Sequence, residues 1–402
     1  MSRRRYLLAA ASVSVLAVGA VACGQPSVAP ALPPVAASAS ASVPATSTPA
    51  TPVPPTPASS APAAAAGCVN AQELGAVPLR QQLAQLLMVG VDPSGSAQTK
   101  DVVAQGVGGI FVGGDATGLL TSGVLQQLQS TTRFGVLVAA DEEGGRVQRI
   151  DELAGSVPSA RDMAATMTVQ QVHDLAFARG VQLHKYGITV DFAPDADVSD
   201  QPRNTVIGDR SFSVSPAVVT AYADAFARGL REAEVLPVFK HFPGHGEASG
   251  DSHKGAVSTP SLAALQGRDL VPFRQLVPSA SAVMVGHLDV PGLTEPGVPA
   301  SLSPAAIGLL RQGSGYGAKA FDGVVFTDDL GGMAAVTDSH DVPHAVLDAL
   351  VAGADVALFI TAGQLPAVLD LLQNAVADKQ LPPQRVQDSL RRVLTAKNVR
   401  LC

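Results

Sequence analysis

Residues Leu236 to His253 read LPVFKHFPGHGEASGDSH and join a short apolar run to a polar loop that is rich in glycine. The run Leu236–Phe239 shows no strict alternation, which is typical of a strand buried on both faces. In α/β barrels, the loops that follow such strands carry the chemistry. This loop concentrates groups that can hold or move protons, namely Lys240, His241, His245, Asp251 and His253. The stretch therefore predicts a parallel sheet with a functional site at the carboxyl ends of its strands.

Similar apolar runs recur along the chain. They are Leu86–Val91, Gly109–Val112, Val136–Ala140, Ile188–Phe192, Ala282–Val285, Val324–Thr327 and Val356–Ile360. Amphipathic stretches lie between them. One follows Ser215-Pro216, a good cap before a good first helical residue, and another runs from Thr168 to about Lys185. Eight strands alternating with helices predict an α/β fold, a single (β/α)8 barrel of the TIM type; an open doubly wound sheet is the alternative.

The first residues have the features of an export signal. Arg3, Arg4 and Arg5 give a positive start, and Tyr6–Ala22 is apolar but short for a bilayer span. The segment ends before Cys23 in a pattern that resembles a bacterial lipoprotein cleavage site. We therefore expect residues 1–22 to be removed, Cys23 to carry a lipid, and the protein to be anchored at the outer face of the cell membrane. A simple secretory signal with an incidental cysteine is the alternative.

Residues 23–66 consist almost entirely of Pro, Ala, Ser, Thr and Val and contain almost no charge. Such a segment cannot bury enough apolar surface to offset the entropy of ordering it. We interpret it as a disordered tether between the membrane and the folded domain. No second linker follows, so residues 67–402 suit one barrel domain, which we expect to be monomeric.

Net charge and cysteine content narrow the function further. A net charge of −7 gives no reason to expect nucleic acid as a partner, and aromatic residues make up only 4% of the chain. With Cys23 assigned to the lipid, Cys68 and Cys402 remain, one near each end of the expected domain. Because barrels bring their termini close and exported proteins form disulfides, a bond between these two cysteines is a natural hypothesis.

A second polar signal lies far downstream, in VVFTDDLGGM from Val324 to Met333. Its apolar run ends in Thr327-Asp328-Asp329. Carboxylates at the end of a buried strand cost free energy unless they have a partner or a task. The alternative is an ordinary strand end at which an aspartate caps the following helix.

The DSH segment of the first stretch is typical of a proton-transfer unit. Asp251 stands two residues before His253, and a carboxylate near an imidazole favours its charged form. The alternatives are a polar surface loop and a metal site that uses His241 and His245. Pro243 and Gly244 oppose the helix that this spacing would need, so the metal reading is the weaker one.

Four motifs in order resemble glycoside hydrolase family 3. They are DEEGGRVQR (Asp141–Arg149), IGDRSF (Ile207–Phe212), KHFPGHG with DSH, and FTDDLGGM. The chain is most similar to the family's single-domain bacterial β-N-acetylglucosaminidases, which act on peptidoglycan fragments. The resemblance runs from Leu79 to Ile360 and covers essentially the whole expected domain. It implies an exo-acting, retaining hydrolase of muropeptides of the GlcNAc-MurNAc type, with no cofactor and no metal.

The resemblance also implies roles for individual residues. Asp328 would be the nucleophile of a covalent glycosyl intermediate, and His253, held by Asp251, the acid and base. Sugar-binding roles fall on Asp141, Arg149, Arg210, Lys240 and His241. Structural ion pairs are the alternative: Arg146 or Arg149 with Glu142 or Glu143, and Arg210 with Asp209. His287 would either line the pocket or be a satisfied core histidine, and His173, His184, His340 and His344 are expected to be surface or structural.

Other functions stay open at this point. A phosphorylase could use the same residues, because a neutral imidazole repels phosphate less than a carboxylate does. A non-catalytic lipoprotein that binds peptidoglycan would need neither Asp328 nor the Asp251–His253 pair. A β-glucosidase of the same family usually has a second domain that supplies a carboxylic acid, and this chain has no room for one. A metal-dependent hydrolase is the weakest reading.

Overall fold

The computed structural model describes residues 68–279 and 281–402 of the 402-residue chain. The expected signal at 1–22, the lipidation site Cys23 and the tether at 23–66 lie outside the described residues. Within the described part, no helix is both long and apolar enough to span a bilayer.

Eight parallel strands form one sheet in the order β7-β6-β5-β4-β3-β2-β1-β8. The sheet closes where Phe326 of β7 bridges to Val356 beside β8, and the Thr327 amide donates to the Val356 carbonyl at 3.1 Å. The predicted (β/α)8 barrel is therefore confirmed, and the open doubly wound alternative is wrong. The strands are β1 Leu87–Val91, β2 Gly109–Val112, β3 Leu137–Ala140, β4 Val190–Asp191, β5 Leu236–Phe242, β6 Ala282–Val285, β7 Val325–Thr327 and β8 Ala357–Phe359.

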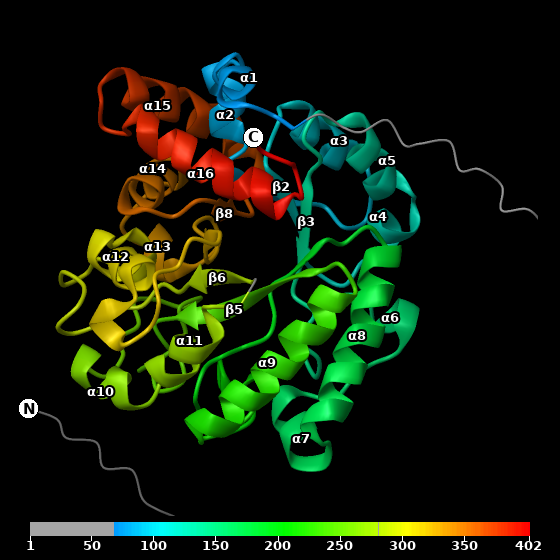
Figure 1. The fold of residues 1–402 in the computed structure, drawn as a ribbon, viewed down its shortest axis with the longest axis vertical. Coiled ribbons are helices and arrows are strands. Elements are labelled where there is room, and N and C mark those ends of the chain that lie inside the picture. The colour runs from blue at the N-terminus through cyan, green and yellow to red at the C-terminus, as the bar shows by residue number, and fades with distance from the viewer. Residues whose placement is uncertain (1–67, 280) are drawn as a thin grey trace, which may run out of the picture. The chain divides into compact units, whose positions relative to one another are not determined.

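Helices connect every pair of successive strands and surround the barrel (Figure 1). The shorter ones are α1 Ala71–Gly75, α2 Leu79–Ala84, α3 Ala97–Ala104, α4 Gly118–Thr121, α5 Val124–Thr131, α6 Asp151–Ala154, α7 Ala160–Thr166, α10 Leu262–Gly267, α11 Leu270–Leu276 and α13 Ala334–Thr337. The longer ones are α8 Val169–Lys185, α9 Pro216–Glu232, α12 Pro304–Gln312, α14 Val342–Ala352, α15 Leu365–Ala377 and α16 Pro383–Ala396.

The two helices expected from capping signals form where predicted. Thr168 and Gln171 make a capping box at the start of α8, and the chain leaves that helix at Gly187, whose φ is +84°. Pro216 is the first residue of α9, although the Ser215 side chain makes no capping hydrogen bond. Along α9 the periodic residues Val219, Phe226 and Leu230 are fully buried, so this apolar face packs inward as its spacing predicts.

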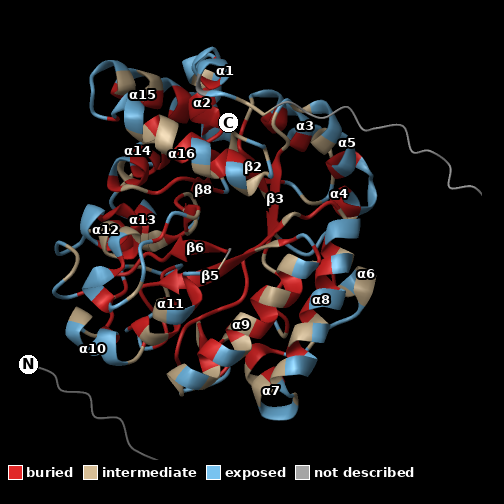
Figure 2. Ribbon diagram, viewed as in Figure 1, coloured by how far each residue is buried: buried red, intermediate tan, exposed pale blue. Residues whose placement is uncertain are grey.

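Burial follows the layers of the fold (Figure 2). The strands are buried along almost their whole length, while the surrounding helices are buried on one face and exposed on the other. This is the pattern of a parallel sheet covered by helices, and it explains the absence of alternation in the apolar runs. The core is continuous from the barrel interior to the inner faces of the helices.

The two ends of the described chain are joined. Cys68 and Cys402 form a disulfide with 5.4 Å between their Cα atoms, so the hypothesised pairing is present. Beside it, Val69 pairs with Leu401 as an isolated parallel bridge, supported by a 2.8 Å bond from the Val69 amide to the Arg400 carbonyl. The carboxyl end of the chain thus lies next to the segment that leads into α1 and α2.

Candidate active site

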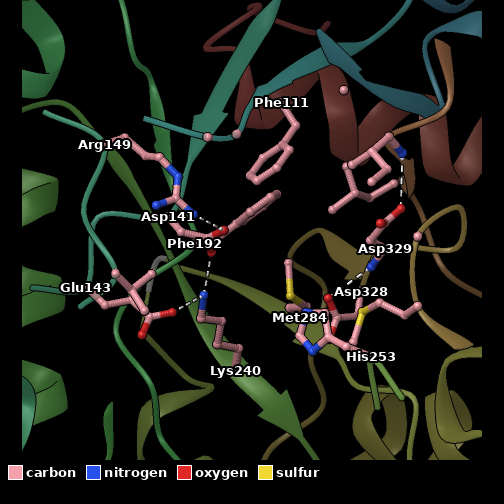
Figure 3. Close-up of a pocket in the computed structure, with 18 of the residues that line it drawn as sticks. Phe111, Asp141, Glu143, Arg149, Phe192, Lys240, His253, Met284, Asp328 and Asp329 are labelled. Atoms are coloured by element: carbon pink, nitrogen blue, oxygen red, sulfur yellow. Dashed lines mark hydrogen bonds and ion pairs between the residues drawn. The ribbon is translucent and has the colours of Figure 1, made fainter. Parts of the chain in front are cut away.

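A cavity of about 750 Å³ opens at the carboxyl ends of the strands. This volume lies within the range of ordinary small-ligand sites. Eight residues were expected from the sequence to act in catalysis or sugar binding, and seven of them line it: Asp141, Arg149, Arg210, Lys240, His241, His253 and Asp328. The eighth, Asp251, does not line this cavity but contacts one residue that does. Figure 3 shows two groups facing each other across the space, with Arg149, Asp141, Glu143 and Lys240 on one side and Asp328, Asp329 and His253 on the other.

Asp328 is held rigidly at the end of β7. Its amide donates to the Val285 carbonyl of β6 at 3.1 Å, and its Oδ1 accepts the Asp329 amide at 2.9 Å. Burial acts to raise the pKa of Asp328, but His287, His241, the Asp329 amide and Lys240 outweigh it and lower the pKa. The carboxylate is therefore ionised at neutral pH, as a nucleophile must be.

Asp329 has a different task from the helix cap considered above. Its Oδ1 accepts the amides of Gly331 at 2.8 Å and Ile360 at 3.1 Å, so it fixes the turn that follows β7 to the end of β8. The next helix, α13, has Met333 as its N-cap and no side-chain cap bond. The interpretation of Asp329 as a helix cap is wrong, because its carboxylate binds amides of the turn and of the residue after β8 instead of the amides of α13. Burial raises the pKa of Asp329 to about 6.

The imidazole of His253 is oriented by Asp251. His253 Nδ1 lies 2.9 Å from Asp251 Oδ1, and the His253 amide donates to the same oxygen at 3.1 Å. Only Nε2 is then left to face a ligand, which is the arrangement that general acid catalysis needs. Burial acts to raise the pKa of Asp251, while the hydrogen bonds from His253 and Lys254 lower it. The loop therefore holds a carboxylate-oriented imidazole at the cavity, and the His253 side chain is 62% exposed.

On the opposite wall, a buried lysine gathers two carboxylates. Lys240 Nζ lies 2.6 Å from Asp141 Oδ1 and 2.5 Å from Glu143 Oε1. Glu143 also receives two bonds from Arg210, at 2.7 and 2.8 Å. Burial acts to raise the pKa of Glu143, but Arg210 and Lys240 hold it far below its ordinary value. The wall presents alternating cations and anions, which suits the hydroxyl and amide groups of a sugar.

The ion pairs differ from those considered on the sequence. Arg210 pairs with Glu143 and, at 3.3 Å, with Asp195, and not with Asp209. The Asp209 carboxylate is 3.2 Å from Arg146 instead. Glu142 faces away from the cavity and pairs with the buried Arg179 at 3.4 Å. The pairings considered for Glu142, Glu143 and Asp209 are therefore wrong. The turn after β3 points its two glutamates in opposite directions, and Asp209 pairs with Arg146 rather than with the adjacent Arg210.

The ring of His241 is held by two aspartates that were not predicted from the sequence. Its Nδ1 lies 2.8 Å from Asp197 Oδ2 and 3.6 Å from Asp195 Oδ1. Burial acts to lower the pKa of His241, but Asp195 and Asp197 outweigh it and raise the pKa. His241 lines the cavity, and its Nε2 lies 3.5 Å from a guanidinium nitrogen of Arg210. Both aspartates lie on the loop after β4, and no motif in that loop marked them.

The buried cluster of Asp195, Asp197 and His241 also has the spacing of a metal site, with ligand atoms within 4.8 Å of one another. Arg210 already forms an ion pair with Asp195 at 3.3 Å, and His241 Nδ1 already lies 2.8 Å from the Asp197 carboxylate. A divalent ion there would meet the repulsion of Arg210 at close range. His245, the second histidine of the metal reading, is not a member of this cluster.

His245 and His287 are buried histidines with contrasting surroundings. His287 is a satisfied core histidine: its ring nitrogens lie 2.7 Å from Ser301 Oγ and 2.9 Å from the Asp329 carbonyl. Burial lowers its pKa. His245 lines the cavity, and neither of its ring nitrogens has a hydrogen-bond partner among the described residues. Burial lowers the pKa of His245 to about 4.

Comparison with known proteins gives one consistent result. Residues 78–396 match the glycosyl hydrolase family 3 N-terminal domain. The chain is 56% identical over 321 residues to the β-hexosaminidase LpqI of Mycobacterium tuberculosis, covering 79% of this chain and 82% of that protein. The solved structure of M. tuberculosis LpqI superposes with a TM-score of 0.79 at 54% identity, over 82% and 97% of the two chains. A family 3 β-N-acetylglucosaminidase from a Paenibacillus species superposes with a TM-score of 0.74 at 31% identity, over 81% and 63%.

Proposed function

The chain belongs to glycoside hydrolase family 3 as a β-hexosaminidase, and from this premise we propose that it is a retaining exo-β-N-acetylglucosaminidase that releases terminal GlcNAc from peptidoglycan fragments. Because the chain is an enzyme, the alternative of a non-catalytic lipoprotein that binds peptidoglycan is wrong. The coarser activity comes from the family and its relatives. The substrate, the covalent intermediate and the residue roles are our proposal.

One observation carries the proposal: an ionised carboxylate and a carboxylate-held imidazole line the same cavity. Asp328 provides the first, and His253 with Asp251 the second. Retaining glycosidases need a nucleophile on one side of the anomeric carbon and an acid on the side of the leaving group. Asp141 and Glu143 of the same lining suit these tasks less well because both are paired with Lys240, and Asp329 accepts the amides of Gly331 and Ile360.

The reaction then proceeds in two displacements. In the first, an oxygen of Asp328 attacks the anomeric carbon, the bond from that carbon to the leaving oxygen breaks, and Nε2 of His253 gives its proton to that oxygen. In the second, Nε2 takes a proton from water, the water oxygen attacks the same carbon, and the bond to Asp328 breaks. Two inversions at one carbon retain its configuration.

Asp251 has a positioning task in this scheme. It accepts a hydrogen bond from His253 Nδ1 and so leaves the catalytic proton on Nε2. It also stabilises the imidazolium that exists before the first step and after the second. The loop contains Gly250 and Gly255, and the conformational freedom of glycine lets such a loop carry the imidazole toward the leaving oxygen.

The opposite wall binds the sugar. Asp141 accepts hydrogen bonds from sugar hydroxyls, and Arg149, Arg210, Lys240 and His241 donate to hydroxyls and to the N-acetyl carbonyl. Glu143 lines the same wall and holds Lys240 and Arg210 in place. The apolar part of the lining, from Phe192, Met284 and Met333, offers contacts to the ring face and the acetyl methyl group.

Incubation with defined muropeptides tests the proposal. We expect free GlcNAc to accumulate from GlcNAc-MurNAc and its peptide derivatives, at the same rate with and without added phosphate. Release of GlcNAc 1-phosphate when phosphate is present would identify a phosphorylase instead. Cleavage of a chromogenic N-acetylglucosaminide but of no muropeptide would contradict the peptidoglycan assignment.

We further propose that the full chain is exported and anchored through a lipid on Cys23, at the outer face of the membrane. The support is the sequence of residues 1–23 alone. Expression of the full chain in a bacterial host with labelled fatty acid tests this. The label should enter the wild-type protein and not the Cys23→Ser variant, and label in both would contradict the anchor.

A further inference from the structure

A second cavity, of about 550 Å³, adjoins the active site. Val206 lines both cavities, and the DSH loop contributes His253 to the first and Asp251 and Lys254 to the second. Its other walls come from Arg146, the 201–206 loop that follows β4, and the start of the DSH loop at Ala248–Gly250. The two cavities thus lie on either side of the segment that delivers the catalytic proton.

We propose that this second cavity, which we call the stem cavity, binds the carboxylate-bearing peptide stem of the leaving group, with a stem carboxylate paired to Lys254. The inference rests on the proposed function and deepens it, because it names the part of the substrate that the enzyme recognises beyond the scissile bond. It also makes an anionic muropeptide a better substrate than a neutral N-acetylglucosamine oligomer.

An exposed ammonium group gives the stem cavity a place for an anion. Its lining carries two cations, Lys254 and Arg146, against the single carboxylate of Asp251. The Lys254 side chain is 81% exposed, and its one ion-pair partner among the described residues is Asp251 at 3.2 Å. The ammonium therefore keeps donors free for a ligand. Arg146 is paired with Asp209 at 3.2 Å and donates to the Thr205 carbonyl, so Lys254 is the cation of this cavity that can bind a ligand.

The uncharged part of the lining suits a peptide. The amide side chains of Gln201 and Asn204 and the hydroxyl of Ser249 lie around the cavity. The Gln201 amide nitrogen makes only a long 3.4 Å contact with the Ala248 carbonyl. Amides and hydroxyls can both donate to and accept from peptide groups, so this surface matches a short peptide better than an apolar ligand.

The position of the catalytic proton determines which part of the substrate lies near the stem cavity. To protonate the leaving oxygen, His253 must touch the sugar next to the cleaved bond. Lys254 directly follows His253 in the chain. A group that projects from that sugar across the loop would enter the cavity that Lys254 lines. In a muramic acid residue this group is a lactyl ether, extended by a peptide that carries carboxylates. In a plain N-acetylglucosamine residue the same position is a hydroxyl.

A ratio of two rates isolates this interaction from catalysis. The two substrates are GlcNAc-MurNAc-dipeptide with free carboxylates and the same compound with those carboxyls converted to amides. Both use the same nucleophile and the same acid. Any effect of a Lys254 substitution through Asp251 therefore acts on both and cancels in the ratio of their kcat/KM values. We expect wild-type protein to favour the free carboxylates by about fivefold, the scale of an exposed ion pair.

The variants and their expected ratios follow. Lys254→Met should bring the ratio close to one, and Lys254→Arg should keep it near the wild-type value. Lys319→Met is the matched control, since Lys319 is exposed and lies between α12 and β7, away from both cavities. That variant should leave the ratio unchanged. Raising the salt concentration should lower the wild-type ratio, because exposed charges are screened.

A wild-type ratio near one, or a ratio that Lys254→Met does not change, would overturn the stem cavity while leaving the proposed hydrolysis intact. Failure of the proposed function has a different signature, in which neither muropeptide releases GlcNAc although a chromogenic N-acetylglucosaminide is cleaved. That result would remove the basis of this inference as well.

Discussion

The carbonyl oxygen of Ser252 accepts a hydrogen bond from the amide of Ala335 at 3.0 Å. Ser252 precedes the catalytic histidine of our proposal, and Ala335 lies in α13, the helix that follows Asp328. The bond therefore connects the loop of the acid and base to the segment of the nucleophile. Ser252 and His253 both line the cavity of Asp328, so this bond belongs to a conformation in which both segments border one cavity.

An acid role for His253 makes the effect of its removal depend on the leaving group. His253→Ala should slow hydrolysis of a GlcNAc disaccharide by roughly a hundredfold or more, the usual scale of general acid catalysis. A dinitrophenyl N-acetylglucosaminide, whose leaving group needs no proton, should lose much less in the first step. Steady-state and pre-steady-state rates on both substrates check this. Equal losses on both would contradict the acid role, and Asp251→Asn should show the same pattern more weakly.

Removal of Lys240 should destabilise the fold as well as weaken substrate binding. Lys240→Met leaves Asp141 and Glu143 without their shared cation in a buried wall. Breaking one side of a buried ion pair typically costs about 3 kcal/mol or more, and Arg210 still holds Glu143, so we expect about 2 kcal/mol. Urea unfolding measures this difference, with Lys319→Met as the control. A double variant that also carries Glu143→Gln should regain part of the loss, and an unchanged midpoint would contradict the network.

Asp269 predicts a pH dependence of stability. It is buried against Gly244, and burial raises its pKa to about 7, above the unfolded value of about 3.9. The contribution of the neutral Asp269 carboxyl to the free energy of unfolding is therefore fully present below about pH 4 and is lost as the pH rises through about 7. Asp269→Asn cannot ionise, so the variant should gain stability relative to wild type between these values, by at most about 4 kcal/mol.

Urea unfolding at pH 4, 6 and 8 tests the Asp269 prediction. The stability difference between Asp269→Asn and wild type should grow with pH. The exposed Asp200→Asn is the control and should show a constant difference. A difference for Asp269→Asn that stays the same across this range would contradict the assignment.

The Cys68–Cys402 disulfide should contribute substantially to stability. It links residues 334 apart in the sequence. By the chain-entropy model, a loop of this length gives about 5 kcal/mol, and measured values are often smaller. Cys402→Ser, or reduction of the wild-type protein, should lower the thermal midpoint, and the reducing agent should have no further effect on the variant. Two free thiols in the denatured, non-reduced protein would contradict the bond.

Much of the architecture was predictable from the sequence, for identifiable reasons. Each buried strand is a run of apolar residues flanked by glycine or polar residues, and all eight runs became strands. Their bounds shifted most at β4, where Ile188–Phe192 was expected and Val190–Asp191 is paired, and at β5, which continues to Phe242. Pairing with neighbouring strands sets such bounds, and the apolar pattern does not record it.

The site was predictable where a motif supplied the residue and not elsewhere. Which of two adjacent glutamates faces the cavity depends on the turn after β3, where Gly144 and Gly145 take φ of +95° and +60°. The sequence DEEGG contains that turn but does not give its direction. Asp195 and Asp197 were missed because they follow the shortest strand in a loop without a recognisable pattern. The sequence does show two aspartates shortly after a strand. Only the fold shows that they are buried and lie beside His241.

Trapping the intermediate tests the central claim most directly. A 2-acetamido-5-fluoro sugar with a good leaving group should inactivate the wild-type protein, and peptide mapping by mass spectrometry should locate the label on Asp328. Asp328→Ala should stay folded and take up no label. A label on Asp329 or on any other side chain, or turnover that inverts the anomeric configuration, would contradict the account.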